Sequence, residues 1–287
     1  MSRKLIIFFS MLSVLSYFGV IFIIISPLSG IGTTFYTNNY MQSYPLRRAP
    51  SLQVRWCKEL RWRSPPARHP VALVSFPGSG NTWLRYLLQQ LTGIVTGSIY
   101  MDYGLRLNGF PAENISDGSV LVVKTHENPP LEPDRFKAAI LLIRNPRDAI
   151  LADYNWLHKG HIGTAPKSAF HWANYVASQL KAWQALHRAW LAQFSGPIHI
   201  VFYEVLVQDT RTTLQAIMNF LNHTVTEVNM NCTMANKEGI YRRPKKYSNF
   251  DPFTKNMYEE LKQVRTRVLK MVVKYQKQHN ETQLLHR

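Results

Sequence analysis

Residues 71–83 read VALVSFPGSGNTW, an apolar run that passes into a small turn and then into a helical pattern. Two glycines and a serine let the main chain curl so that several N–H groups point inward, and a helix starting near Asn81 adds the positive end of its dipole. The helix is predicted from an apolar stripe made by Leu84, Leu87, Leu88 and Leu91. The sequence thus predicts a strand, an anion-binding turn and a helix in succession.

The turn alone does not identify its ligand. The phosphate loop of ATPases and kinases carries a lysine and then a serine or threonine directly after its last glycine, whereas Asn81 and Thr82 follow Gly80 here. This difference disfavours an ATPase or kinase, although a nucleotide kinase with a degenerate loop stays one interpretation. A plain connection between a strand and a helix is the other.

An uncharged segment near the start is long enough to cross a membrane. Residues 5–26 carry no charge and would extend about 33 Å as a helix, against about 30 Å for a bilayer core. Arg3 and Lys4 precede this segment and the next charge is Arg47, so residues 1–4 are predicted to face the cytosol. We therefore expect a transmembrane signal-anchor of the single-pass type II kind, with a cleaved signal peptide as the alternative.

A luminal location of the remaining chain permits glycosylation and disulfide formation. Acceptor sequons for N-linked glycans begin at Asn114, Asn222, Asn231 and Asn280. The two cysteines of the chain, Cys57 and Cys232, are predicted to pair, and two buried free thiols are the alternative. The chain is therefore expected to be a glycoprotein with one disulfide.

The formal net charge of +17 favours polyanionic partners. A luminal chain seldom meets nucleic acid, and no aromatic RNA-binding signature or compact basic helix occurs. We therefore expect no nucleic acid partner. The expected partners are an acidic glycan or glycoprotein acceptor, an anionic cofactor, and the membrane through the anchor.

The order of patterns along the chain predicts a stem followed by one α/β domain. Residues 27–68 mix proline, serine, threonine and tyrosine without periodicity, which is typical of a stem, and residues 69–287 suit one domain. Short apolar runs alternate there with helical patterns, which indicates a mainly parallel sheet flanked by helices. The predicted strands are 71–76, 119–124, 139–144 and 198–203, and the predicted helices are 81–92, 147–158, 168–193, 209–222 and 256–278.

Three more segments carry polar residues suited to an anionic ligand. Lys-Thr-His at 124–126 and Arg-Asn-Pro-Arg-Asp at 144–148 lie at predicted strand ends, and a basic run at 241–246 follows later. In an open parallel sheet, residues at the carboxyl ends of strands converge on the ligand crevice. The turn, a lysine with a histidine, and an arginine are therefore predicted to face one cleft.

These segments, in this order, resemble sulfotransferases that use 3′-phosphoadenosine-5′-phosphosulfate (PAPS). The resemblance covers most of residues 70–260, and the loop FPGSGNTW most resembles the membrane-anchored family named for a WSC domain, which is associated with sulfation of sialic acid. The cysteine-rich WSC module itself is not in this sequence. The resemblance implies a P-loop-like open parallel sheet flanked by helices, residence in the Golgi membrane, and transfer of a sulfuryl group from PAPS to a glycan hydroxyl, with sialic acid as one candidate sugar.

The resemblance also implies roles for individual residues. The 5′-phosphate would be held by the loop and first helical turn, with Trp83 near the adenine: Pro77, Gly78, Ser79, Gly80, Asn81, Thr82 and Trp83. Arg144 would hold the 3′-phosphate, and Arg242 and Arg243 would close over it, a solvated loop being the alternative. His126 would act as general base, and Lys124 would neutralise the bridging oxygen. No metal site is predicted.

Two departures from the resemblance favour a rival interpretation. Gly78 stands where many family members have a loop lysine, and Ala152 stands where the family has a serine. One leaving-group contact and one phosphate contact are thereby missing. The alternative is a membrane-anchored glycan- or nucleotide-binding pseudoenzyme that keeps the fold without turnover.

Overall fold

A computed structural model describes residues 54–64, 69–130, 135–161, 163–165, 172–241 and 251–285. All of them belong to the second of two compact units of the chain, residues 45–287. The predicted membrane span and the pair Arg242 and Arg243 lie outside the described residues. Among those that are described, no helix is both long and apolar enough to cross a bilayer.

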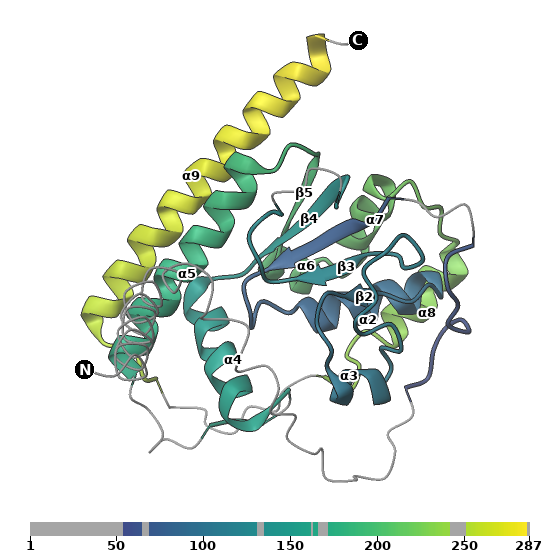
Figure 1. Ribbon diagram of the computed structural model, residues 1–287, viewed down its shortest axis with the longest axis horizontal. Coiled ribbons are helices and arrows are strands. Elements are labelled where there is room, and N and C mark those ends of the chain that lie inside the picture. The colour runs from purple at the N-terminus through teal and green to yellow at the C-terminus, as the bar shows by residue number, and fades with distance from the viewer. Residues whose placement is uncertain are drawn as a thin grey trace, which may run out of the picture. The chain divides into compact units, whose positions relative to one another are not determined.

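The centre of the described unit is a five-stranded sheet in the order β2-β3-β1-β4-β5, with every neighbouring pair parallel (Figure 1). Its strands are β1 (Val71–Ser75), β2 (Gly97–Ser98), β3 (Val123–Thr125), β4 (Ala138–Ile143) and β5 (Ile198–Phe202). Because all strands run the same way, their carboxyl ends share one edge of the sheet. The predicted parallel α/β fold is therefore confirmed.

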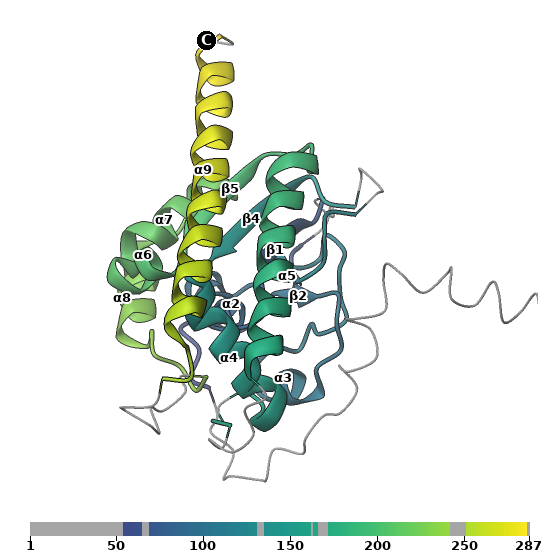
Figure 2. The same cartoon turned by 90° about the vertical axis from the view of Figure 1, so that its left-hand side faces the viewer.

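Helices cover both faces of the sheet, as Figures 1 and 2 show. One face is covered by α4 (Pro146–Lys159), α5 (Trp172–Gln193) and α9 (Lys255–Leu285). The other is covered by α2 (Asn81–Thr92), α6 (Tyr203–Gln208), α7 (Thr210–Phe220) and α8 (Glu227–Ala235), and the short α3 (Tyr103–Leu107) follows β2. Helix α9 continues past the body of the domain at its C-terminal end (Figure 2).

The two faces of the sheet carry separate apolar cores. Ala72 and Val74 of β1 pack with the α5 and α9 side chains, whereas Leu73 between them packs with α2 and α7. This alternation follows from the period of two along a strand. Burial on both faces explains why the strands read as continuous apolar runs rather than as alternating ones.

The predicted strand at 119–124 is wrong at its start, because β3 begins only at Val123. At residues 119 and 121 the main chain bonds with loops instead of strands: Leu121 N–H donates to Val95 O, and Ser119 O accepts from Arg63 N–H. Strand β2 and helices α3, α6 and α8 were not predicted. Each has nine residues or fewer, which is too short for a hydrophobic period to be recognised in the sequence.

Residues 54–64, at the end of the predicted stem, lie against the domain. Arg61 pairs with Ile94 in an isolated parallel bridge, and Cys57 N–H donates to Gln90 Oε1 of α2 at 2.8 Å. A disulfide joins Cys57 to Cys232 of α8, with 5.9 Å between the Cα atoms. This part of the chain is therefore fixed to the folded domain, and the predicted boundary at residue 69 stays a prediction.

Candidate functional site

The turn between β1 and α2 forms a tight main-chain loop. Gly78 and Gly80 have φ angles of +76° and +93°, in the region that only glycine adopts at low cost. A Cβ on Gly78 would lie 2.3 Å from Ala149 O, and one on Gly80 would lie 2.5 Å from the ring of Tyr203. The loop therefore packs so closely on α4 and α6 that neither position has room for a side chain.

Polar atoms of the loop are left without partners in a way that suits an anion. Ser79 is fully buried, and its Oγ has no hydrogen-bond partner among the described residues. Asn81 Nδ2 donates to Leu73 O at 3.1 Å and to Ser75 Oγ at 3.2 Å, which ties the start of α2 to the end of β1. The N-terminus of the twelve-residue α2 adds the positive end of its dipole beside the loop.

Arg144, directly after β4, reaches back to the same loop. Its Nη1 donates to Gly78 O at 2.7 Å, and its guanidinium lies 4.3 Å from the centre of the Tyr203 ring. Its Nε is buried and has no hydrogen-bond partner in the described part of the chain. The following Asn145 caps α4 by accepting from Arg147 N–H at 3.1 Å, while Arg147 pairs with Asp148.

Lys124 in β3 and His126 just after it lie on the other side of β1. Lys124 is 7% exposed, and no hydrogen bond or ion pair to its Nζ is found among the described residues. His126 Nδ1 lies 2.7 Å from Ser75 O, and His126 N–H donates to the hydroxyl of Tyr100 at 2.9 Å. Since a carbonyl only accepts, Nδ1 carries the proton and Nε2 keeps its lone pair in the neutral ring.

The electrostatic environment keeps the imidazole neutral. Burial, together with the charge of Lys124, lowers the pKa of His126 to about 3, against the hydrogen bond to Ser75 O, which raises it. Burial also lowers the pKa of Lys124, while the charge of Glu113 acts in the opposite direction. A neutral histidine beside a lysine at a sheet edge is suited to accept a proton near an anion.

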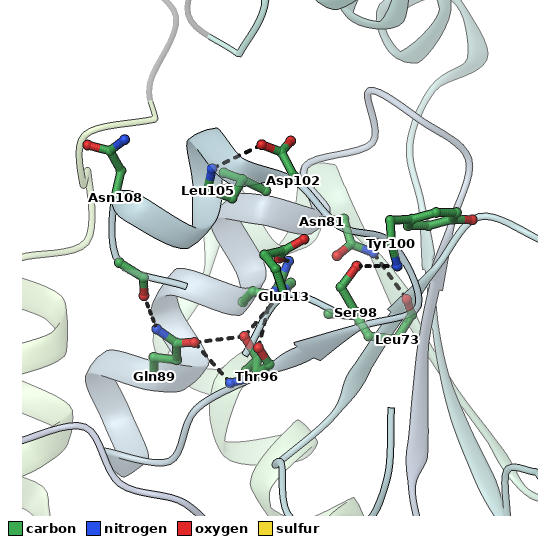
Figure 3. A network of polar contacts seen from close by, with 12 residues as sticks. Leu73, Asn81, Gln89, Thr96, Ser98, Tyr100, Asp102, Leu105, Asn108 and Glu113 are labelled. Carbon is green, nitrogen blue, oxygen red and sulfur yellow. Dashed lines mark hydrogen bonds and ion pairs between the residues drawn. The ribbon is translucent and has the colours of Figure 1, made fainter. Parts of the chain in front are cut away.

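Behind the site lies a buried polar network that the sequence did not reveal (Figure 3). Arg85 of α2 forms an ion pair with Glu113 at 2.6 Å, both side chains being fully buried. Arg85 Nε also donates to Thr96 Oγ1 at 3.0 Å, and Thr96 N–H donates to Gln89 Oε1 at 2.9 Å. These contacts fix α2, and with it the loop at its start, against the segment around β2.

Tyr100 and Tyr203 are the site residues whose placement the sequence did not predict. Tyr100 follows β2 in a segment with no motif, and Tyr203 begins α6 directly after β5. The Tyr203 ring lies under Arg144 and contacts Trp83 edge-on at 5.9 Å. Trp83 itself donates through Nε1 to Lys237 O at 2.7 Å.

The remaining predicted residues fall in several places. Pro77 is buried in the loop and Thr82 is partly exposed in the first turn of α2. Asn114 and Asn222 are exposed at positive φ, whereas Asn231 lies inside α8 and accepts from Arg211. Asn280 lies in α9. The described residues contain no group of three or more histidine, cysteine or acidic side chains that could bind a metal ion.

Comparison with known proteins identifies the class. Residues 68–272 match the family described as the sulfotransferase domain. The crystal structure of mouse sulfotransferase SULT7A1 complexed with PAP superposes with a TM-score of 0.51 at 16% identity, over 75% of this chain and 90% of that one. At this identity the likeness shows a shared fold. The chain belongs to the sulfotransferase family.

Curated relatives narrow the family further. A WSCD family member of Aedes aegypti is 42% identical over 253 residues, which cover 78% of this chain and 79% of that protein. A WSCD family member of Drosophila melanogaster is 48% identical over 196 residues, or 66% of this chain and 62% of that protein. The chain thus spans less than two thirds of the Drosophila relative. Within the sulfotransferases, it is a member of the WSCD family.

Proposed function

We propose that this chain is a PAPS-dependent O-sulfotransferase whose acceptor is a hydroxyl of an acidic glycan. One observation carries the proposal: the carboxyl ends of β3, β1 and β4 bring the glycine loop, the pair Lys124 and His126, and Arg144 to one edge of the sheet. Two contacts of 2.7 Å join these parts, His126 to Ser75 O and Arg144 to Gly78 O. The PAP in the mouse structure supports the same cofactor for this chain.

The residues present fit a bisphosphate cofactor. The loop offers main-chain N–H groups, the N-terminus of α2 and the Oγ of Ser79, which no described residue contacts by a hydrogen bond, for the 5′-phosphate. Arg144 uses Nη1 on the loop, which leaves its Nη2 and its Nε, the latter without a hydrogen-bond partner in the described part of the chain, for the 3′-phosphate. Bound PAPS would supply the sulfuryl group and a phosphate leaving group.

His126 and Lys124 have complementary roles in the proposed transfer. His126 Nε2 accepts the proton of the acceptor hydroxyl as its oxygen forms the bond to sulfur. Lys124 stabilises the negative charge that builds up on the phosphate oxygen as the bond between sulfur and that oxygen breaks. Because Gly78 has no room for a side chain, Lys124 takes over the work of a loop lysine.

The acceptor and the cellular location are proposed from the sequence. The net charge of +17 is suited to an acidic glycan, and sialic acid is a candidate sugar. The uncharged segment at 5–26 supports a type II anchor in the Golgi membrane with the catalytic domain in the lumen. A panel of sialylated and neutral oligosaccharides incubated with labelled PAPS tests the sugar.

The first experiment is a titration of the purified protein with PAP (adenosine 3′,5′-bisphosphate) and with ADP, which lacks the 3′-phosphate. We expect the wild type to prefer PAP and Arg144→Ala to weaken PAP binding roughly tenfold or more, because a charged hydrogen-bond donor is lost. Arg106→Ala, which removes an exposed arginine of α3, is the matched control and should bind PAP as the wild type does. Equal affinity of the wild type for PAP and ADP would refute the cofactor assignment.

The second experiment separates an enzyme from a binding protein. Lys124→Ala should lower turnover far more than PAPS affinity, and His126→Ala should abolish transfer while PAP binding persists. The lack of a loop lysine at Gly78 is the observation that favours a pseudoenzyme. Tight PAP binding without transfer to any glycan of the panel would make that rival function the better one.

A further inference from the structure

His126 forms hydrogen bonds with Ser75 and with Tyr100, and Tyr100 lies outside every recognised motif. On one side, its Nδ1–H donates to Ser75 O at the end of β1, at 2.7 Å. On the other side, its main-chain N–H donates to the Tyr100 hydroxyl at 2.9 Å. The Tyr100 ring also stacks on the imidazole, with ring centres 5.7 Å apart and planes 20° apart. Backbone, ring plane and tautomer of His126 are thus all fixed.

The Tyr100 side of this arrangement is itself anchored. Tyr100 N–H donates to Ser98 Oγ of β2 at 3.1 Å, and Tyr100 O accepts from Asn114 N–H at 2.9 Å. Figure 3 shows Tyr100 next to Ser98, and Asn81 nearby with its hydrogen bond to Leu73 of β1. The main chain of Tyr100 is therefore fixed, and its ring contacts His126 from the segment that follows the edge strand β2.

Tyr100 also faces the second polar residue of the β3 end. The Nζ of Lys124 lies 5.7 Å from the centre of the Tyr100 ring, within the range of a cation–π contact. One aromatic side chain thus contacts both the proposed base and the proposed cation. A displaced base loses much of its effect, since a shift of about 1 Å can cost roughly a hundredfold in rate.

We propose that Tyr100 is a positioning residue: its hydroxyl and its ring keep His126 beside Ser75 O, so that this carbonyl retains the proton on Nδ1 and Nε2 stays open to accept the proton of the acceptor. The inference rests on the proposed function for the part that concerns catalysis. The structural part, that Tyr100 fixes the position of the His126 imidazole, does not depend on turnover. The state of the imidazole and the rate of transfer are therefore measured separately.

The hold on His126 is tested by ¹⁵N NMR of histidine-labelled protein, with the His126 signals assigned from their loss in His126→Gln. We expect the Nδ1–H tautomer in the wild type and a larger share of the Nε2–H tautomer in Tyr100→Phe, which removes only the hydroxyl. Tyr100→Leu, which removes the stacking as well, should enlarge the change. Tyr103→Phe is the matched control, since that tyrosine is 60% exposed, and it should leave the signals unchanged.

The catalytic part is tested by binding and turnover in the same variants. Tyr100→Phe should keep the PAP affinity within about twofold and lower kcat by roughly tenfold to a hundredfold, as a misplaced base would. Unchanged His126 signals in both Tyr100 variants would overturn the proposal, whatever happens to turnover. Failure of the wild type to bind PAP would refute the proposed function instead, and the NMR result would then decide the hold on His126 alone.

Discussion

At the scale of single residues, the loop at Gly78 offers only main-chain groups to a ligand, because a side chain there would clash with α4. Gly78 combines a φ of +76° with a main chain of α4 so close that a Cβ would meet Ala149 O at 2.3 Å and Asp153 N at 2.7 Å. No side chain at Gly78 can therefore contact an anion, which leaves that role to the loop N–H groups, to Ser79 Oγ and to side chains from other strands. The positive charge of the site comes from Lys124 and Arg144, at the ends of β3 and β4.

Gly78→Ala tests this close approach. We expect a loss of about 2–4 kcal/mol in the free energy of unfolding, from left-handed strain and from overpacking against α4, and weaker PAP binding as the loop shifts. Gly160→Ala is a control without crowding, because a Cβ there would have nothing within 4 Å; with a φ of +70° and a ψ of −163°, its loss of stability reports backbone strain alone. Urea unfolding and PAP titration of both variants measure the effects, and PAP binding that is unchanged in Gly78→Ala would contradict the packing argument.

The titration of His126 is a second prediction at this scale. Its pKa is lowered to about 3, so the ring is neutral above about pH 4 and the base stays competent across pH 5–8. An exposed histidine would instead lose this capacity below its usual value of about 6.5. A bound bisphosphate adds negative charge beside Lys124 and should raise the pKa of His126. NMR titration with and without PAP checks both statements, and a pKa near 6.5 in the free protein would contradict them.

At the scale of elements, α2 connects the loop to two other parts of the fold. Its side chains hold the segment at 54–64 through Gln90, and the residues after α8 through Trp83 and Tyr86, which donate to Lys237 O and Asn236 O. The disulfide between Cys57 and Cys232 joins these two partners of α2 to each other. The described residues just before the basic run are therefore held by contacts with α2.

Removal of the disulfide should therefore act on stability more than on binding. The bond closes a loop of 175 residues, and we expect the double variant Cys57→Ser/Cys232→Ser to lose about 2–5 kcal/mol in the free energy of unfolding. PAP affinity should stay within about threefold, since Leu87, Leu88 and Leu91 keep α2 on the sheet. Urea unfolding beside PAP titration measures both, and loss of affinity without loss of stability would contradict this division.

The elements that could be predicted from sequence are those with strong apolar patterns. Strands β1, β4 and β5 and helices α2 and α5 follow from buried runs and stripes, and they place the loop and Arg144 at one edge of the sheet. The start of strand β3 could not be predicted, because residues 119–121 are buried or partly buried like a strand although Ser119 and Leu121 bond with loops, and burial alone does not distinguish the two cases. Tyr100 and the Arg85–Glu113 pair were missed because their partners lie far away in sequence or carry no motif.

At the scale of the whole molecule, two apolar cores enclose several ionisable groups. The pair Arg85 and Glu113 is fully buried in the layer of α2, and His187 is fully buried beside Trp183 in the layer of α5. Hydrogen bonding and charge from His161 outweigh burial and lower the pKa of Asp102 to about 2. Carboxylates with lowered pKa lose their stabilising effect only below their unfolded value of about 3.9, so between pH 6.5 and 4 the histidines dominate.

His187 should therefore make the fold sensitive to mild acid. Burial lowers its pKa to about 4, against the hydrogen bond to Trp183 O, whereas the unfolded chain binds the proton near pH 6.5. The unfolded state thus gains the proton first, and the contribution of His187 to the free energy of unfolding falls by about 3 kcal/mol as the pH drops from 6.5 to 4.

The variant His187→Leu removes this group and should flatten the pH dependence by about one proton, or about 1.4 kcal/mol per pH unit, within that window. His158→Leu is the matched control: its Nδ1 makes the same contact with the carbonyl four residues earlier, Tyr154 O at 2.8 Å, but the residue is partly exposed. Urea unfolding at pH 7, 6, 5 and 4.5 gives the slopes. If the free energy of unfolding depends on pH in the same way for the wild type and for His187→Leu, the pKa of His187 is not lowered by folding. The packing around α5 would then tolerate a charged imidazole, which contradicts the prediction.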